Sequence, residues 1–220
     1  MSVWAILAAA GRGDRLGLDR PKAFAKLNDR PLIVEVLERL DASDWIEGIV
    51  VAAPPDWEEP CILAAEEVAA TKVAETVTGG ETRTASVRRA LAQVPGEAAV
   101  ILVHDAARPL VTEDVIERVV TGLEDGWDGA VPVVPVPDTI KRVDGQAVVE
   151  TVDREGLAAA QTPQAFVADA LRRALASGAD ASDCAALVEA AGGRIRAVEG
   201  DPRLVKITDA SDLALVESWL

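Results

Sequence analysis

Glycines and basic side chains closely follow the first apolar run of the chain. The run at residues 3–8 leads into four small residues, Ala9, Ala10, Gly11 and Gly13. Without a Cβ in the way, backbone N–H groups in such a loop approach a phosphate or a base closely. Arg15 and Lys22, which come next, would supply positive charge to the same ligand. This combination predicts a phosphate-binding loop, although each element alone also fits a plain turn with solvated arginines.

This loop matches neither of two common nucleotide motifs. A Walker A loop needs Gly-Lys-Ser/Thr, and a dinucleotide fingerprint needs a third glycine where this chain has Leu16. A dinucleotide-binding oxidoreductase is therefore a disfavoured alternative.

Asp105 follows a second apolar run, at residues 99–103. A parallel strand there would deliver the carboxylate to the carboxyl edge of the sheet, where ligands of such folds bind. An oxygen ligand at that place suits Mg²⁺, which commonly bridges a protein acid and substrate phosphates. The structural alternative is a helix cap or an ion-pair partner for Arg108. His104, the single histidine, is expected to be packed and hydrogen-bonded rather than reactive.

The net charge of the chain limits the kinds of molecule that it is expected to bind. The formal net charge is −15 and the pI is about 4.5, which argues against nucleic acid and anionic membrane surfaces. In an acidic protein that handles phosphates, the basic groups are expected to concentrate at the site. Cys61 and Cys184 lie far apart without Cys or His neighbours, so neither a disulfide framework nor a zinc site is expected.

Apolar runs alternate with amphipathic stretches along the whole chain, which predicts a doubly wound α/β fold with a mainly parallel sheet, covered by helices on both faces. Residues 1–220 are expected to form a single domain. Strands are expected at 99–106, 129–136 and 194–200. Helices are expected to begin near Ser86, Thr112, Phe166, Ser182 and Asp209. No apolar run reaches the roughly 18 residues of a membrane span, and no export signal is recognised at the start, so a cytoplasmic location is expected.

Residues 139–152 break this pattern. Two β-favouring stretches flank Asp144-Gly145, which predicts a hairpin with a type I′ turn. We expect this hairpin to be an arm that projects from the main sheet.

Further motifs occur in collinear order over essentially the whole chain. They are Gly79-Gly80-Glu81 with Arg83 and Ser86, His104-Asp105-Ala106-Ala107-Arg108-Pro109, Asp138-Thr139-Ile140-Lys141, Asp153-Arg154, Thr162-Pro163-Gln164 with Phe166, Ser182-Asp183 and Lys206-Ile207-Thr208. With the glycine loop they resemble the 2-C-methyl-D-erythritol 4-phosphate cytidylyltransferases, a family within the GT-A-like, Rossmann-like nucleotidyltransferases. The resemblance implies an enzyme of non-mevalonate isoprenoid biosynthesis that transfers CMP from CTP, with Mg²⁺, to a small sugar-alcohol phosphate and releases pyrophosphate.

The resemblance also implies roles for individual residues. Arg15 and Lys22 match positions that steady the transition state, and Arg154 and Lys206 match positions that place the sugar phosphate. The nucleotide-binding positions are Ala9, Ala10, Gly11, Gly13, Gly80, Glu81, Ser86, Asp105 and Ala106. The sugar-phosphate positions are Arg108, Thr139, Arg154, Thr162, Ser182 and Lys206. Asp105 is the expected metal ligand, and a homodimer with exchanged arms, which carry Arg154 into the partner's pocket, is expected.

The chain departs from the family pattern at supporting positions, among them Ala23, Ala85 and Leu204. These changes leave the expected reaction type in place and bear on sugar specificity. Two alternatives stay open: a cytidylyltransferase for ribitol 5-phosphate or another polyol phosphate, and a nucleotide-binding module without turnover.

Overall fold

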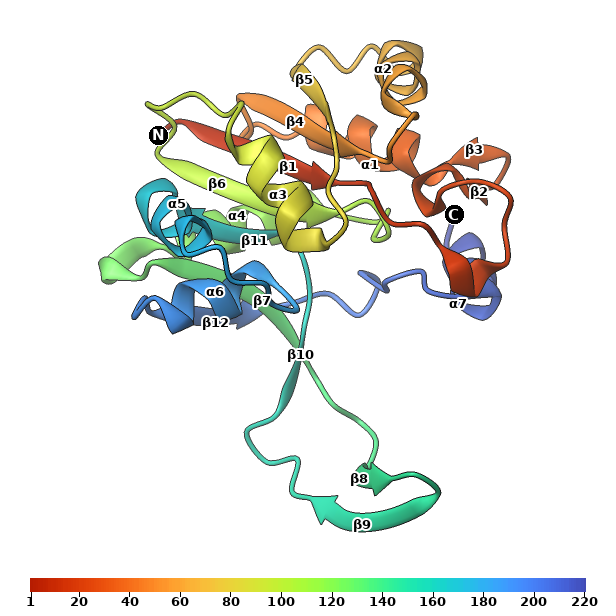
Figure 1. Cartoon of the computed structure of the whole chain (residues 1–220), viewed down its shortest axis with the longest axis vertical. Coiled ribbons are helices and arrows are strands. Elements are labelled where there is room, and N and C mark those ends of the chain that lie inside the picture. The colour runs from red at the N-terminus through yellow and green to blue at the C-terminus, as the bar shows by residue number, and fades with distance from the viewer.

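A twisted eight-stranded sheet forms the centre of the computed structural model, which describes residues 1–220 (Figure 1). The strands of the sheet are β1 (Val3–Ala8), β4 (Gly48–Ala53), β5 (Val73–Thr78), β6 (Val100–Asp105), β7 (Gly129–Pro135), β10 (Ala158–Ala160), β11 (Gln164–Val167) and β12 (Ile195–Glu199). Their order is β10-β7-β11-β6-β1-β4-β5, with β12 also paired to β7. β1 is parallel to β4 and β6, whereas β10 and β11 are antiparallel to their neighbours. The expected mainly parallel sheet is confirmed.

Helices cover both faces of this sheet. They are α1 (Leu32–Asp41), α2 (Glu58–Glu67), α3 (Arg83–Leu91), α4 (Glu113–Thr121), α5 (Ala168–Ala176) and α6 (Cys184–Ala190). The last helix, α7 (Ala210–Glu217), packs away from the sheet, in a third apolar cluster with Leu27 and Leu32. Side chains of β1 alternate between two cores: Leu7 packs in the cluster that includes α1, α2 and α4, and Ile6 packs in the cluster that includes α3, α5 and α6. A strand buried on both faces needs apolar residues throughout, which is why residues 3–8 show no polar alternation.

Smaller elements complete the chain. Three 3₁₀ turns are η1 (Asp14–Leu16), η2 (Lys22–Phe24) and η3 (Glu124–Gly126), and a short ladder joins β2 (Lys26–Leu27) to β3 (Arg30–Pro31). None of the helices is long and apolar enough to cross a bilayer.

The expected arm is the hairpin of β8 (Ile140–Asp144) and β9 (Ala147–Val152), which projects below the body in Figure 1. Its turn differs from the prediction. Asp144 pairs with Ala147, so Gly145 and Gln146 are the central residues, and only Gly145 has a positive φ, of 56°. A type I′ turn needs positive φ at both central residues, whereas a type II′ turn needs it at the first alone. The type I′ assignment was wrong, because glycine supplies the first central position rather than the second.

The region around Phe166 also differs from the expectation. The helix expected to begin there starts at Ala168, and Phe166 lies in β11, fully buried against the sheet. This four-residue strand inserts antiparallel between β6 and β7. A short apolar strand that runs directly into a helix has no turn residues to separate the two, so sequence periodicity alone did not resolve them.

Candidate active site

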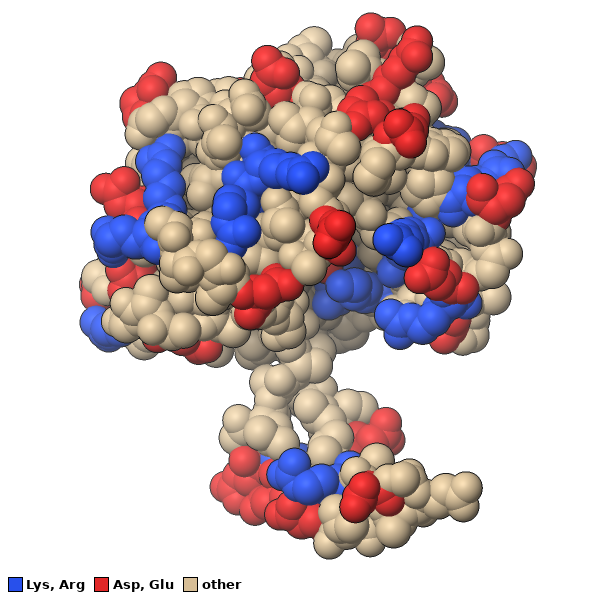
Figure 2. Space-filling view, in the orientation of Figure 1, with Lys and Arg blue, Asp and Glu red and all other residues tan.

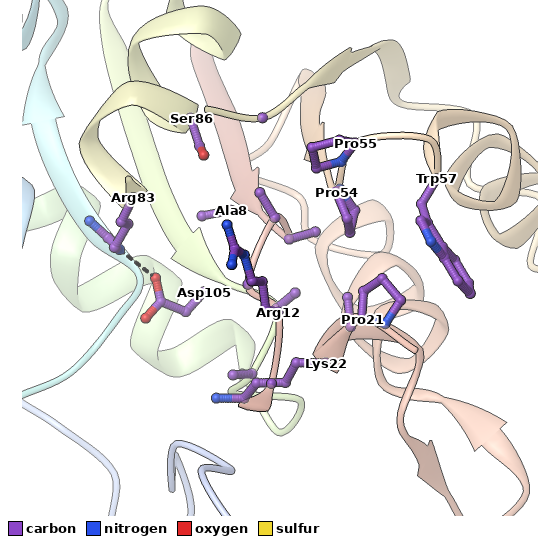
Figure 3. A pocket seen from close by; sticks show the side chains of 18 of the residues that line it. Ala8, Arg12, Pro21, Lys22, Pro54, Pro55, Trp57, Arg83, Ser86 and Asp105 are labelled. Atoms are coloured by element: carbon purple, nitrogen blue, oxygen red, sulfur yellow. Dashed lines mark hydrogen bonds and ion pairs between the residues drawn. The ribbon is translucent and has the colours of Figure 1, made fainter. Parts of the chain in front are cut away.

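A cavity of about 1030 Å³ opens at the carboxyl ends of β1, β4 and β6 (Figure 3). Its walls come from the loop after β1, from Pro54, Pro55 and Trp57 after β4, from the 78–89 segment, and from Asp105 at the end of β6. This edge of a parallel sheet is where ligands of doubly wound folds bind. Seven lysines or arginines and four acids line the cavity, although acids outnumber basic residues 37 to 22 in the whole chain. The expected concentration of basic groups is therefore present.

On the face shown in Figure 2, arginines and lysines lie beside this opening and over α3, while Asp and Glu dominate the surface over α2. Such a distribution favours an anionic ligand at the opening over one at α2.

The loop after β1 is folded back so that Lys22 lies against its glycines. The Lys22 backbone N–H donates to the Gly11 carbonyl at 3.1 Å. Gly13 has a φ of 78°, and a Cβ there would lie 2.9 Å from the Lys22 Cβ. Only glycine satisfies both conditions without displacing Lys22. The loop thus needs Gly13 in order to bring the Lys22 ammonium into the cavity, where Arg15 also lies.

The turn before α3 is held from two sides. The Ser86 hydroxyl accepts the Gly80 N–H at 3.0 Å and donates to the Thr82 carbonyl at 2.9 Å. Arg89 donates to the Gly79 carbonyl of the same turn at 2.8 Å. The Ser86 hydroxyl is thereby engaged in ordering the turn that presents Gly80 and Glu81 to the cavity. The helix start expected near Ser86 is confirmed, and contact of this turn with a ligand stays a prediction.

Asp105 is nearly buried and each of its carboxylate oxygens meets a cation. Arg83 Nε lies 2.7 Å from Oδ1, and Lys206 Nζ lies 2.7 Å from Oδ2. Burial alone would raise the pKa of Asp105, but the charges and hydrogen bonds of Arg83 and Lys206 outweigh burial and hold the pKa below its usual range. Asp105 is therefore a permanent carboxylate in a basic surrounding.

Lys22 has a shifted pKa. Burial disfavours its charged form and lowers its pKa to about 8, and the nearby positive charges of Lys206 and Arg15 act in the same direction, while Asp105 opposes them. A bound anion would raise this pKa again, because opposite charge favours the charged form. Lys22 is thus a cation whose pKa responds to an anionic ligand.

A buried network behind the cavity fixes Asp105 from below. The Thr162 hydroxyl accepts the Asp105 backbone N–H at 3.1 Å and donates to His104 Nδ1 at 3.1 Å, while His104 Nε2 donates to the Arg108 carbonyl at 3.0 Å. We assign this direction of the hydrogen bonds because burial lowers the pKa of His104 to about 4 and keeps the ring neutral. His104 and Thr162 thus support Asp105 from behind the cavity.

The Arg108 guanidinium is turned toward the backbone. It donates to the Leu204 carbonyl at 2.5 Å and to the Ala160 carbonyl at 3.3 Å. These bonds fasten the segment that carries Lys206. The alternative in which Arg108 pairs with Asp105 is not observed, because Arg83 and Lys206 are the ion-pair partners.

The structure separates the expected site residues into two sets. Twelve line the cavity: Ala9, Ala10, Gly11, Gly13, Arg15, Lys22, Gly80, Glu81, Ser86, Asp105, Ala106 and Lys206. Five do not line it: Arg108, Thr139, Arg154, Thr162 and Ser182. Thr139 and Arg154 lie on the two limbs of the arm, where Arg154 bonds to the Pro137 carbonyl, and Ser182 is exposed before α6. All nine expected nucleotide positions thus fall in one cavity, whereas most sugar-phosphate positions lie outside it.

Comparison with known proteins gives a consistent result. The family model for 2-C-methyl-D-erythritol 4-phosphate cytidylyltransferase matches residues 3–220. The chain belongs to this family. Members of that name from Saccharopolyspora erythraea and Nocardia farcinica are 46% and 43% identical to it, over 100% of this chain and 100% and 94% of theirs. The crystal structure of the Thermus thermophilus member superposes with a TM-score of 0.83 at 36% identity, over 100% of this chain and 98% of that one.

Several cavity residues were not assigned a role from the sequence of this cytidylyltransferase family member. They are Arg12, Trp57, Arg83, Arg89 and Thr208. The signal for Arg83 was present, since it stands within the motif that begins at Gly79, but a motif does not say which group an arginine contacts. Trp57 packs on Phe24 with ring centroids 4.6 Å apart, and no spacing pattern pointed to it.

Proposed function

We propose that this chain transfers CMP from CTP to 2-C-methyl-D-erythritol 4-phosphate and releases pyrophosphate. The observation that carries the proposal is the family match over residues 3–220, together with a basic cavity that collects all nine expected nucleotide positions. The chain is thereby a nucleotidyltransferase of the non-mevalonate route to isoprenoid precursors.

The chemistry needs alignment and charge neutralisation rather than proton transfer. A phosphate oxygen of the sugar attacks the α-phosphorus of CTP in line, a new P–O bond forms, and the bond to the β-phosphate breaks with its electron pair leaving on pyrophosphate. Arg15 and Lys22 lie in the cavity where they would neutralise the charge that develops on the triphosphate. Lys206, at the floor beside Asp105, would hold the sugar phosphate.

Magnesium fits this site as an ion carried in by the nucleotide. No cluster of three or more histidine, cysteine or acidic side chains is present, so the protein offers no preformed cage. Asp105 is the buried carboxylate at the cavity floor, and Mg²⁺ in such sites typically takes one or two carboxylates plus phosphates and water. When bound, the ion would neutralise negative charge on the phosphates of the nucleotide. Asp105 is the residue we propose to face it.

A homodimer would complete the sugar-phosphate side. The arm exposes Val143, Val148 and Val149, each more than half accessible, and a lone two-stranded ribbon is marginally stable in water. Two-fold dimers are the commonest soluble assemblies, and exchange of arms would bring the partner's copies of Thr139 and Arg154 toward the cavity. A cytoplasmic location is part of the same proposal, since the substrates are small charged metabolites.

A substrate screen tests the proposal. CTP, UTP, ATP and GTP are crossed with methylerythritol phosphate and ribitol 5-phosphate, and pyrophosphate release is measured. We expect the highest kcat/KM with CTP and methylerythritol phosphate. Higher turnover with ribitol 5-phosphate would show that the substrate is that polyol phosphate instead. Equal rates with a purine triphosphate would contradict the preference for CTP. Binding without pyrophosphate release would indicate a nucleotide-binding module without turnover.

A further inference from the structure

Asp105 has two cationic partners that differ in freedom. Arg83 is the first residue of α3, its side chain is 20% exposed, and its Nη1 also donates to Cys184 Sγ at 3.5 Å. Lys206 lies on a segment without regular structure, its side chain is 43% exposed, and its ammonium has no protein partner other than Asp105. The Arg83–Asp105 contact is drawn as the dashed line in Figure 3. The arginine is a fixed counter-ion and the lysine a movable one.

A movable cation is what substrate binding requires. For the Lys206 ammonium to bind the sugar phosphate, it must leave the Asp105 oxygen that it contacts in the free protein. A carboxylate whose side chain is 9% exposed would then lose a partner, and stripping a buried charge of its counter-ion is strongly unfavourable. Arg83 removes this penalty, because its bond to the other oxygen stays in place.

Resting on the proposed function, we propose that Arg83 is a positioning residue that holds the Asp105 carboxylate and so frees Lys206 for the sugar phosphate. Nη2 of Arg83 is buried without a hydrogen-bond partner, so the guanidinium keeps a buried orientation that only its contacts with Asp105 and Cys184 compensate. An arginine that only stabilised the fold would not need to share a carboxylate with Lys206, the residue proposed to bind the sugar phosphate. Arg83 acts through Asp105 on Lys206 and not on the reacting atoms.

Replacement of Arg83 gives a specific kinetic signature. In Arg83→Met, Lys206 becomes the only cationic side chain on the Asp105 carboxylate and is retained there, so KM for the sugar phosphate should rise about tenfold. The KM for CTP should change less than about threefold, and kcat should fall less than the sugar-phosphate KM rises. Arg83→Lys should lie between wild type and Arg83→Met, because it keeps the charge without the arginine fork.

The decisive test is a double-mutant cycle with Lys206→Met, by pyrophosphate release at varied sugar phosphate. If Arg83 acts through Lys206, Arg83→Met should add less than about threefold to KM once Lys206 is gone. Arg88→Met is the matched control: this arginine is on the same helix, outside the cavity, and donates to the Leu175 carbonyl at 3.0 Å. Its KM values should match wild type. Thermal melting checks that each variant is folded.

The outcomes separate cleanly. An unchanged sugar-phosphate KM, a rise confined to the KM for CTP, or full multiplication of the two single effects would each overturn the role of Arg83. If Arg83→Met does not fold, the same cycle is run with Arg83→Lys, for which a KM equal to that of wild type would overturn it. Wild-type turnover is measured in parallel, so loss of the proposed function itself is seen as no pyrophosphate from wild type.

Discussion

The nucleotide cavity and the β8–β9 arm are built on opposite principles. Cavity residues stand at the ends of strands whose other side chains are buried in two apolar clusters, so one chain alone fixes them. The arm pairs only with itself, and Val143, opposite Val148 in the ladder, is 63% exposed. The nucleotide cavity is therefore formed within the single chain, whereas we propose that the arm needs the surface of a second chain.

The largest expected effect lies in the cavity. Lys22→Ala should lower kcat about 100- to 1000-fold, the usual loss for one preorganised donor that acts on transition-state charge. Arg154→Ala, on the arm, should instead raise KM for the sugar phosphate with a smaller change in kcat. Steady-state pyrophosphate release measures both. Lys26→Ala, a neighbouring exposed lysine outside the cavity, is the control. A shared modest rise in KM with intact kcat would contradict this division.

The second prediction concerns a substitution on the arm that leaves the cavity residues unchanged. Val148→Asp places a charge on the exposed apolar face of the hairpin, and we expect the dimer to become a monomer, because burying an unpaired carboxylate is costly. Light scattering after size-exclusion chromatography measures the mass. Leu63→Asp changes an equally accessible apolar residue, 55% exposed on α2, and should stay dimeric. A monomeric wild type, or a dimeric Val148→Asp, would refute the arm as the dimer contact.

The third prediction tests whether the arm of one chain serves the cavity of the other. At a sugar-phosphate concentration well below the KM of Arg154→Ala, the Arg154→Ala and Lys22→Ala homodimers should each be much less active than wild type. If sites are completed in trans, a heterodimer holds one intact site and one doubly damaged site. An equal mixture that exchanges freely should recover about a quarter of wild-type sites. Activity is measured after mixing, with heterodimers confirmed by native mass spectrometry. Heterodimers that are no more active than either parent would show that each site is self-sufficient.

The features that could be predicted from the sequence are those that neighbouring residues determine by themselves. An apolar strand followed by small residues and Lys22 places a basic loop at a sheet edge, and Asp105 at the end of β6 follows from the same rule. The hairpin was predicted from its β-favouring stretches. Its turn was not, because Gly145 could occupy either central position until the register was known.

Contacts between distant segments were beyond the sequence. Asp105 meets Arg83, 22 residues before it, and Lys206, 101 residues after it. Which cation a carboxylate selects depends on the packing of three separate elements. For the same reason Arg108 was expected at the sugar phosphate, whereas in the structure its guanidinium bonds to backbone carbonyls.

The smallest effect is a pH dependence that belongs to the cavity alone. Because burial and neighbouring cations lower the pKa of Lys22 to about 8, the free protein loses this positive charge as pH rises through that value. The protonated form is the one that binds and neutralises phosphate. We therefore expect kcat/KM for CTP to fall above pH 8, by up to about tenfold for each unit, since this parameter reports the free enzyme.

Two variants test whether the fall of kcat/KM above pH 8 arises in the cavity rather than on the arm. Lys22→Arg keeps its charge throughout the range, because a guanidinium does not deprotonate in proteins, so its lower activity should stay flat above pH 8. Arg154→Ala should be slower than wild type yet bend at the same pH, since it leaves the surroundings of Lys22 unchanged. The kcat profile of wild type should bend at higher pH than kcat/KM, because the bound triphosphate favours the ammonium form. If kcat/KM still fell above pH 8 in Lys22→Arg, the titrating group would be a residue other than Lys22. If the fall began at a different pH in Arg154→Ala, the arm would influence the pKa of Lys22.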